Sequence, residues 1–324
     1  RSAGGDFCGI WQNPNYGRAQ PTTVLDPSIL SGWGVRPYDW QFGVSVQQEL
    51  LPRISAEVGY YRRWWPIWSG ADVEDNILAA PSDFTEFSVM APTDPRLPGG
   101  GGYEIRGLYN INPDATGREE NVQRSANAYG DYTRYWDGLD LTVQARLSNG
   151  LTVQGGTSTG RTVEDSCAVR TQVPEDGSTD PYCREVEPLR TQFKGLASYL
   201  IPRLDVQVSA TFSSRPGISL SANRVYANAE VRPSLGRDLA SVNNVTINLL
   251  EPNTVFGDRV NQLDLRVGKI LRFGRARANI SMDVVNALNS NDNIGYSATF
   301  SPTWPTPTSV LTARIFRLTA GVDF

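Results

Sequence analysis

The residues with the clearest chemical capacity are the three cysteines, Cys8, Cys167 and Cys183. No CxxC spacing occurs, so neither a zinc site nor a dithiol redox motif is predicted. Cys167 and Cys183 flank a polar stretch with proline and glycine, and a bridge between them would close a loop of about 17 residues and stabilise it by about 3 kcal/mol. We predict this disulfide, and with it an oxidising compartment. The alternative is two unpaired loop thiols, and Cys8 is left over.

The sequence contains no recognisable catalytic or metal-binding motif. Histidine is absent, which removes His-based acid–base chemistry and His-ligated metals. Carboxylates are plentiful, but no pair is marked by its spacing. The glycine-rich stretches 99–102 and 155–161 lack the GK[ST] of a phosphate loop, so we interpret the first as a flexible loop and the second as part of a strand. We expect no enzyme activity, no cofactor and no metal site.

Aromatic residues bracket a long stretch without clear period, residues 66–131. Rings beside carboxylates and amides suit a sugar-like or peptide ligand, and loops on a rigid scaffold often carry binding. We expect recognition chiefly in loops 66–131 and 216–260. The same rings would also suit anchors at a membrane interface, and that alternative stays open. The candidate ligand-binding residues are Trp64, Trp65, Trp68, Tyr103, Tyr132, Tyr135 and Trp136.

The elements that must position these residues are strands, because apolar and polar residues alternate over long windows. The alternation is clearest at the end of the chain, where Phe316, Leu318, Ala320, Val322 and Phe324 share one face. A soluble sandwich could also produce this pattern. The fold class predicted is all-β and antiparallel. The strands are expected near 38–50, 54–65, 134–147, 151–163, 190–200, 204–214, 261–272, 276–288 and 312–324, with boundaries good to about 2–4 residues.

Short and long connections alternate along these strands, and two short turns, LLPR at 50–53 and LIPR at 200–203, are nearly identical. Short turns on one side and long loops on the other are typical of outer-membrane β-barrels. Every tryptophan falls in a long loop or at the strand ends beside one, as in an interfacial girdle. Filling of a soluble core by these rings is the competing interpretation. We predict lipid contact near mid-membrane for Val44, Val58, Leu141, Val143, Val206, Leu265, Ile280 and Leu318.

Composition agrees with a barrel and excludes other classes. No run of about 18 apolar residues is present, so no transmembrane helix is predicted. The net charge is −4 and no basic block stands out, so nucleic acid is not an expected partner. Residues 1–37 are expected to be an extracellular, irregular segment, and 38–324 the barrel strands. Because nine strands is an odd number, we expect the chain to be the C-terminal part of a larger barrel.

Several stretches resemble one known family. They are residues 32–53, 58–65, 94–103, 261–269 and 282–291, together with the terminal strand. These stretches, in the order in which they follow one another, are similar to the C-terminal barrel region of TonB-dependent outer-membrane receptors. The resemblance is particularly to the Oar-like kind with a carboxypeptidase-regulatory-like domain. The family barrel has about 22 strands around a plug. Its signal peptide, TonB-interaction segment and plug have no counterpart in this sequence.

The resemblance implies an outer-membrane location with extracellular loops and energised uptake of a bulky ligand. It also implies four kinds of partner: outer-membrane lipid, the TonB complex, a plug, and the barrel assembly machinery. That machinery reads an aromatic-ended closing strand, here Phe316, Leu318, Val322 and Phe324. Two other hypotheses remain open, namely a structural or adhesive all-β surface protein and a passive porin-like barrel.

Overall fold

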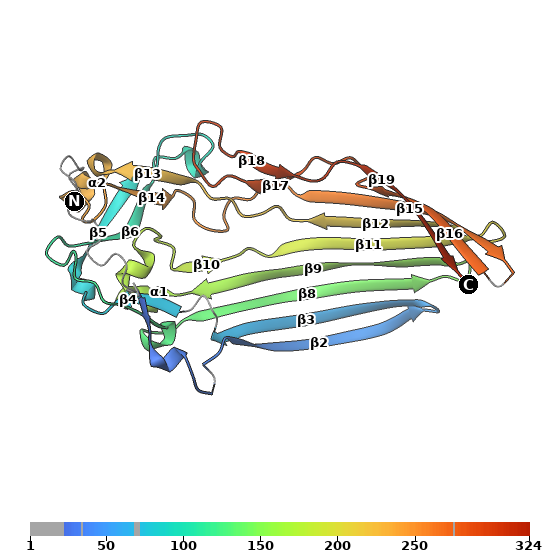
Figure 1. Ribbon diagram of the computed structural model, residues 1–324, viewed down its shortest axis with the longest axis horizontal. Coiled ribbons are helices and arrows are strands. Elements are labelled where there is room, and N and C mark those ends of the chain that lie inside the picture. The colour runs from blue at the N-terminus through green and yellow to red at the C-terminus, as the bar shows by residue number, and fades with distance from the viewer. Residues whose placement is uncertain (1–22, 34, 68–71, 275) are drawn as a thin grey trace, which may run out of the picture.

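The computed structural model describes residues 23–33, 35–67, 72–274 and 276–324. Its main body is one antiparallel sheet of nine long strands, each paired with its neighbour in the sequence of long strands (Figure 1). These strands are β2 (Tyr38–Leu51), β3 (Ile54–Ile67), β8 (Thr133–Arg146), β9 (Leu151–Asp165), β11 (Arg190–Ile201), β12 (Val206–Arg215), β15 (Val260–Phe273), β16 (Ala276–Val285) and β19 (Ile315–Asp323). The short strand β10 (Arg184–Val186) pairs with β9 beside them.

The predicted all-β class and the nine long strands are confirmed. Most boundaries differ from the prediction by only one or two residues, but β16 ends early and β19 begins late. Asn286 explains this, because its φ of 51° turns the chain out of the ladder. Its side-chain amide then donates to the carbonyls of Ser290 at 2.8 Å and Thr312 at 2.9 Å. The last loop is therefore closed by one buried asparagine.

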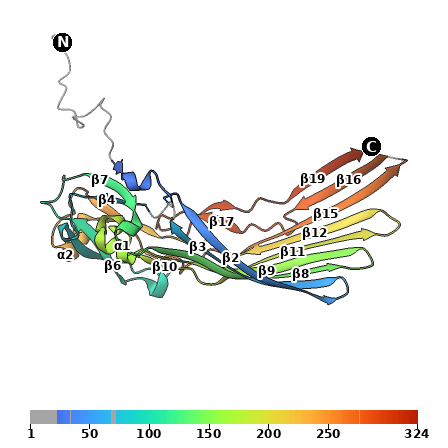
Figure 2. The same ribbon diagram turned by 90° about the horizontal axis from the view of Figure 1, so that it is seen from below.

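The four short turns lie together at one end of the sheet, with the C-terminus, and the long connections lie at the other end (Figures 1 and 2). The two near-identical turns also share a conformation, since Arg53 and Arg203 both have a φ of 70° after a proline. The Arg53 N–H donates to the Glu49 carboxylate at 2.8 Å. Local sequence thus determines these turns.

One face of the sheet is apolar and uncovered. The exposed fractions are 53% for Val58, 42% for Leu141 and 79% for Leu318. The register places residues of this face side by side across strands, with Val46 opposite Val58 and Val58 opposite Leu141. Of the residues predicted to contact lipid, all are exposed except Val206, which is half-buried.

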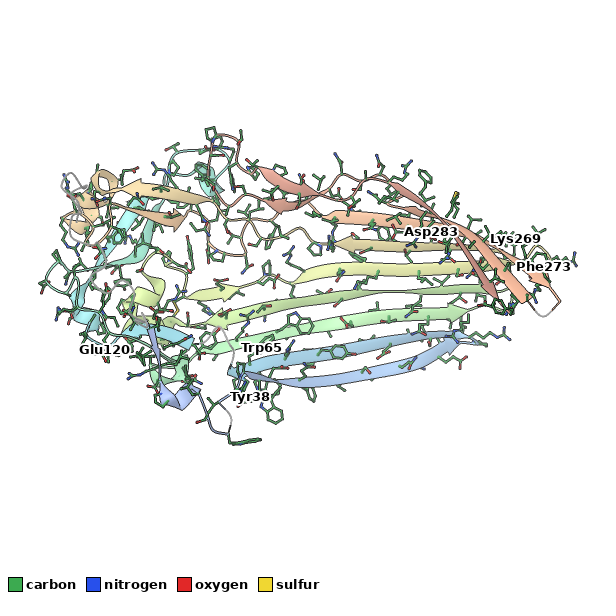
Figure 3. All side chains as sticks on the ribbon, viewed as in Figure 1. Tyr38, Trp65, Glu120, Lys269, Phe273 and Asp283 are labelled. Atoms are coloured by element: carbon green, nitrogen blue, oxygen red, sulfur yellow. A yellow bond between two sulfur atoms is a disulfide. The ribbon has the colours of Figure 1, made fainter. Side chains whose placement is uncertain are left out.

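The opposite face is polar and is cross-linked by ion pairs between strands. Asp283 of β16 is 6% exposed and lies directly opposite Arg266 of β15 and Arg317 of β19. Its carboxylate is 3.3 Å from the Arg266 Nε and 3.0 Å from an Arg317 guanidinium nitrogen. Figure 3 labels Asp283 on its strand. A shallow hollow of about 650 Å³ lies on this face, lined from Asp140 in β8 to Asp264 in β15.

The long connections fold into a unit that we call the loop head, residues 72–132, 166–189, 216–259 and 289–311 (Figure 1). Its strands are β4 (Asp72–Asn76), β5 (Phe84–Met90), β6 (Glu104–Ile111), β7 (Asn121–Ser125), β10, β13 (Asn223–Ala227), β14 (Asn244–Asn248), β17 (Asn293–Tyr296) and β18 (Pro307–Val310). Its helices are α1 (Cys167–Gln172), α2 (Asn228–Leu235) and the 3-10 turns η2 (Pro81–Asp83), η3 (Pro98–Gly100), η4 (Ala126–Ala128) and η5 (Pro174–Gly177).

The expectation that residues 66–131 lack regular structure was wrong. β5 pairs with β6, and β4 pairs with β7. These strands are short and bury their residues against other loops, so the sequence shows no sustained alternation. In the connection 216–259, β13 pairs antiparallel with β14. In the segment 1–37, β1 (Thr23–Leu25) runs parallel to β7, and η1 (Pro27–Ile29) follows it.

Among the residues that the structure describes, the largest hydrophobic core lies in the loop head and not in the sheet. Three connections that are far apart in the sequence supply it: Phe87 and Leu108 from the first, Tyr226 and Ile247 from the second, and Trp304 from the third. The Trp304 indole N–H donates to the Ser221 carbonyl at 2.9 Å. The chain therefore buries apolar surface among its loops while it leaves the apolar face of the sheet uncovered.

Candidate functional site

Four of the candidate aromatic residues come together where β3 and β8 meet the loop head. Trp64, Trp65, Tyr132 and Tyr135 line a hollow of about 670 Å³. Trp64 lies directly opposite Tyr135 in the sheet register. The Arg62 guanidinium lies 4.4 Å from the centre of the Tyr135 ring, a distance at which a cation is attracted to the ring face.

Tyr132 and Trp65 are held by charged neighbours. The Tyr132 hydroxyl donates to the Glu164 carboxylate at 2.5 Å. Burial, reinforced by this hydrogen bond, raises the pKa of Tyr132, so the phenol stays neutral. Two guanidinium groups, those of Arg63 at 4.7 Å and Arg134 at 5.4 Å, lie over the Trp65 ring (Figure 3 shows its position).

Two other candidates lie apart from this group. Trp136 is opposite Arg63 on the polar face, and its ring covers Gly138 and Gly160 so closely that a Cβ at either would lie 2.6 Å or 2.4 Å from it. Tyr103 packs against the core of the loop head, and its hydroxyl donates to the Leu249 carbonyl at 2.6 Å. Trp68 lies outside the described residues. The structure thus divides the predicted set between a hollow, the polar face and a core.

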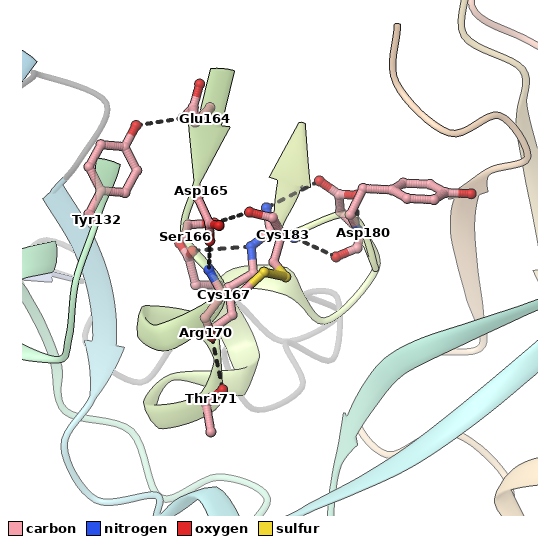
Figure 4. A network of polar contacts seen from close by, with 11 residues as sticks. Tyr132, Glu164, Asp165, Ser166, Cys167, Arg170, Thr171, Asp180 and Cys183 are labelled. Carbon is pink, nitrogen blue, oxygen red and sulfur yellow. Dashed lines mark hydrogen bonds and ion pairs between the residues drawn. A yellow bond between two sulfur atoms is a disulfide. The ribbon is translucent and has the colours of Figure 1, made fainter. Parts of the chain in front are cut away.

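The predicted Cys167–Cys183 disulfide is confirmed (Figure 4). The bridge joins the start of α1 to the chain just before β10, and the Ser166 N–H donates to the Cys183 carbonyl at 2.8 Å. Arg170 of α1 donates to the Asp180 carbonyl at 2.7 Å across the same loop. The loop is held at its base and across its middle, which positions η5 against β4 and β6.

The glycine stretch 99–102, interpreted from the sequence as a flexible loop, belongs to a segment that is tied into the loop head. Arg96 donates to the carbonyls of Ser301 and Trp304, at 2.9 Å and 2.6 Å. Hydrogen bonds from the Arg96 side chain and backbone hold the pKa of Asp94 at about 2. Gly101 has a φ of 74°, and a Cβ there would lie 1.9 Å from the Pro92 carbonyl oxygen. The glycines therefore form a tight turn, for which glycine is required.

A further cavity, which sequence reasoning missed, lies among three connections of the loop head. This cleft has a volume of about 810 Å³ and is lined by β4, β6, η5 and the residues around β14. Its walls are linked: the Asn76 N–H donates to Glu175 at 3.0 Å, and the Tyr109 N–H donates to the Ser178 carbonyl at 3.0 Å. No local motif marks it, because each wall comes from a different part of the chain.

The predicted C-terminal signal residues lie on an edge of the sheet. Phe316, Leu318 and Val322 are opposite Val284, Met282 and Ala278 of β16, and their exposed fractions are 65%, 79% and 59%. Phe324 ends the chain, fully exposed. Strands β2 and β19 are the two edges of the nine-strand sheet within the described ranges.

Within the ranges that the structure describes, no three Cys, Asp or Glu side chains are grouped so that they could hold a metal ion. None of the helices described above has the length and apolar character needed to cross a membrane.

Comparison with protein-family models and with curated proteins by sequence finds no match. Among solved structures, the chain is similar to the crystal structure of the outer membrane transporter YddB from Escherichia coli, with a TM-score of 0.46 and 10% sequence identity. The alignment covers 88% of this chain and 32% of that one, so the chain spans about a third of the transporter's length.

Proposed function

We propose that the nine-strand sheet is a section of the wall of an outer-membrane transport barrel. The observation that carries the proposal is the uncovered apolar face that runs across the long strands. A soluble antiparallel sheet covers one face with other elements. Here the chain buries its apolar core in the loop head instead, and residues such as Val58 and Ile280 are 53% and 50% exposed. Lipid is the solvent in which such a face is stable.

The remaining features support one orientation of the sheet in the membrane. The polar face, with the buried Asp283 between Arg266 and Arg317, would line the lumen, where water or a plug satisfies charged groups. The short turns would lie in the periplasm and the loop head outside the cell, as in bacterial barrels. Aromatic residues where β2, β3 and β8 meet the loop head, including Trp40, Trp64 and Tyr135, would lie at the outer interface.

We further propose that the whole protein is a TonB-dependent receptor that takes up a bulky ligand by energised transport. The support is the resemblance of the stretches 32–53 and 261–269, and of the terminal strand, to that family. The lumen would then hold a plug, and the TonB complex would act on a segment outside this chain. The assembly machinery would read the terminal strand that ends in Phe324.

The location is tested by fractionating cells that produce the full-length protein. We expect it in the outer membrane, folded into a heat-modifiable species on gels, with the loop head accessible to protease added to intact cells. Recovery in the soluble or peripheral fraction would refute the membrane proposal and favour a structural or adhesive surface protein.

Energised transport is tested separately in the same strain. Uptake by the full-length receptor should stop when the proton-motive force is collapsed or TonB is deleted, while surface binding continues. Uptake that persists under both conditions would instead indicate a passive porin-like barrel.

A further inference from the structure

The cleft in the loop head is bounded by residues whose charges all have the same sign. Among the residues that line it are four carboxylates, Glu74, Glu119, Glu175 and Asp176, and no lysine or arginine. Of these four, Asp176 forms an ion pair with Arg170, whose Nε is 3.9 Å from its carboxylate and which also donates to the Asp180 carbonyl at 2.7 Å. Glu74, Glu119 and Glu175 form no ion pair with another described residue, so the lining keeps an excess of negative charge.

Two of these carboxylates are partly withdrawn from water. Burial raises the pKa of Glu175, and it also raises the pKa of Asp176. One Glu175 oxygen accepts the Asn76 N–H at 3.0 Å, and the backbone N–H of Glu175 also donates to this carboxylate, but no described arginine or lysine forms an ion pair with it. A half-buried carboxylate without a cation is unfavourable, and an incoming positive group would offset that cost.

The cleft also offers neutral hydrogen-bonding groups that the protein leaves unused. The hydroxyls of Tyr109 and Thr246 and the side-chain amide of Asn244 line it, and none of them hydrogen-bonds to another described residue. The walls are already linked, since Arg237 and the Ala240 N–H both donate to the Asn110 side chain, at 2.6 Å and 2.9 Å. The cavity is therefore preformed, polar and ready to hydrogen-bond to a ligand.

We propose that this cleft binds the ammonium or guanidinium groups of a basic peptide presented from outside the cell. A volume of about 810 Å³ is far larger than an ion requires, and the carboxylates come from separate elements instead of forming a metal cluster among the described residues. A neutral sugar would desolvate the carboxylates without compensating their charge. The inference deepens the proposed function, on which it rests for the extracellular position of the loop head.

The test uses the full-length protein in detergent and isothermal titration calorimetry with trilysine as the probe. Trilysine with acetylated side-chain amines and the neutral trisaccharide maltotriose are the comparison ligands. We expect trilysine to bind, with an affinity that falls as salt is raised, and neither comparison ligand to bind measurably. Equal binding of the acetylated peptide, or binding of maltotriose alone, would overturn the proposal.

Two substitutions locate the site, and a third is the control. Glu175→Gln keeps the oxygen that accepts the Asn76 N–H, and we expect it to weaken trilysine binding about tenfold. Glu119→Gln should weaken binding as well, and it should not affect folding, because the exposed Glu119 side chain forms no hydrogen bond or ion pair with another described residue. Asp114→Asn removes a charge from an exposed position outside the cleft and should leave affinity unchanged.

If both glutamine variants fold and bind trilysine as the control does, the assignment is wrong. Because binding is measured in detergent, the outcome is separable from the transport proposal. Cleft-dependent binding by a protein that is not in the outer membrane would refute only the proposed function.

Discussion

Replacing Leu141 with arginine measures whether the apolar face contacts lipid. Leu141 is 42% exposed on that face and precedes the end of β8 at Arg146 by 146 − 141 = 5 residues. At about 3.3 Å per residue the separation along the strand is about 17 Å. With a tilt of about 45°, the depth is about 12 Å, close to the middle of an apolar band about 25 Å tall. Arginine at the midplane costs about 2–4 kcal/mol.

The matched control is Thr142→Arg, one residue further along the same strand. Thr142 faces the polar side and lies opposite Glu57, so an arginine there meets water and a carboxylate. Both variants should be compared in phospholipid vesicles by reversible denaturant unfolding, followed by tryptophan fluorescence. We expect Leu141→Arg to lower the free energy of unfolding by about 2–4 kcal/mol and Thr142→Arg to change it by less than about 1 kcal/mol. Equal costs, or no cost at Leu141, would show that this face is not in lipid.

Three further predictions concern the loop head. Glu175→Gln should stabilise the loop head near pH 7. The pKa of Glu175 is raised in the folded protein, so its carboxyl favours folding only when protonated and loses that contribution as pH rises. The difference in stability from wild type, measured by hydrogen exchange, should vanish in acid, and a difference that persists there would contradict this cause. Replacing Cys167 and Cys183 by serine should cost the loop about 3 kcal/mol, seen as faster exchange in α1 with unchanged exchange in β11. Trp304→Ala should cost about 3–5 kcal/mol of loop-head stability and make that region protease-sensitive, whereas a resistant loop head would mean that its core does not depend on this ring.

The candidate site was only partly predictable. The aromatic residues beside β3 and β8 could be grouped because they bracket one connection, and four of them do share a hollow. Tyr103 was grouped with them on ring chemistry, but its hydroxyl bonds to Leu249, which is 146 residues away in the sequence. Trp136 follows Tyr135 directly in the sequence, and because successive side chains of a strand point to opposite faces, the two rings lie on opposite faces of the sheet. Spacing alone does not show which face meets a cavity.

The sheet follows from local sequence. Period-two alternation and turn residues act over a few positions, so strands such as β2 and β8, and turns such as the one at Arg53, can be predicted from local sequence. The loop head, in contrast, depends on contacts between residues that are far apart in the chain. Arg96 meets the Trp304 carbonyl across 208 residues, and the walls of the cleft come from three separate connections. Contacts of that range leave no period in the chain, because each short strand buries its residues against a distant partner.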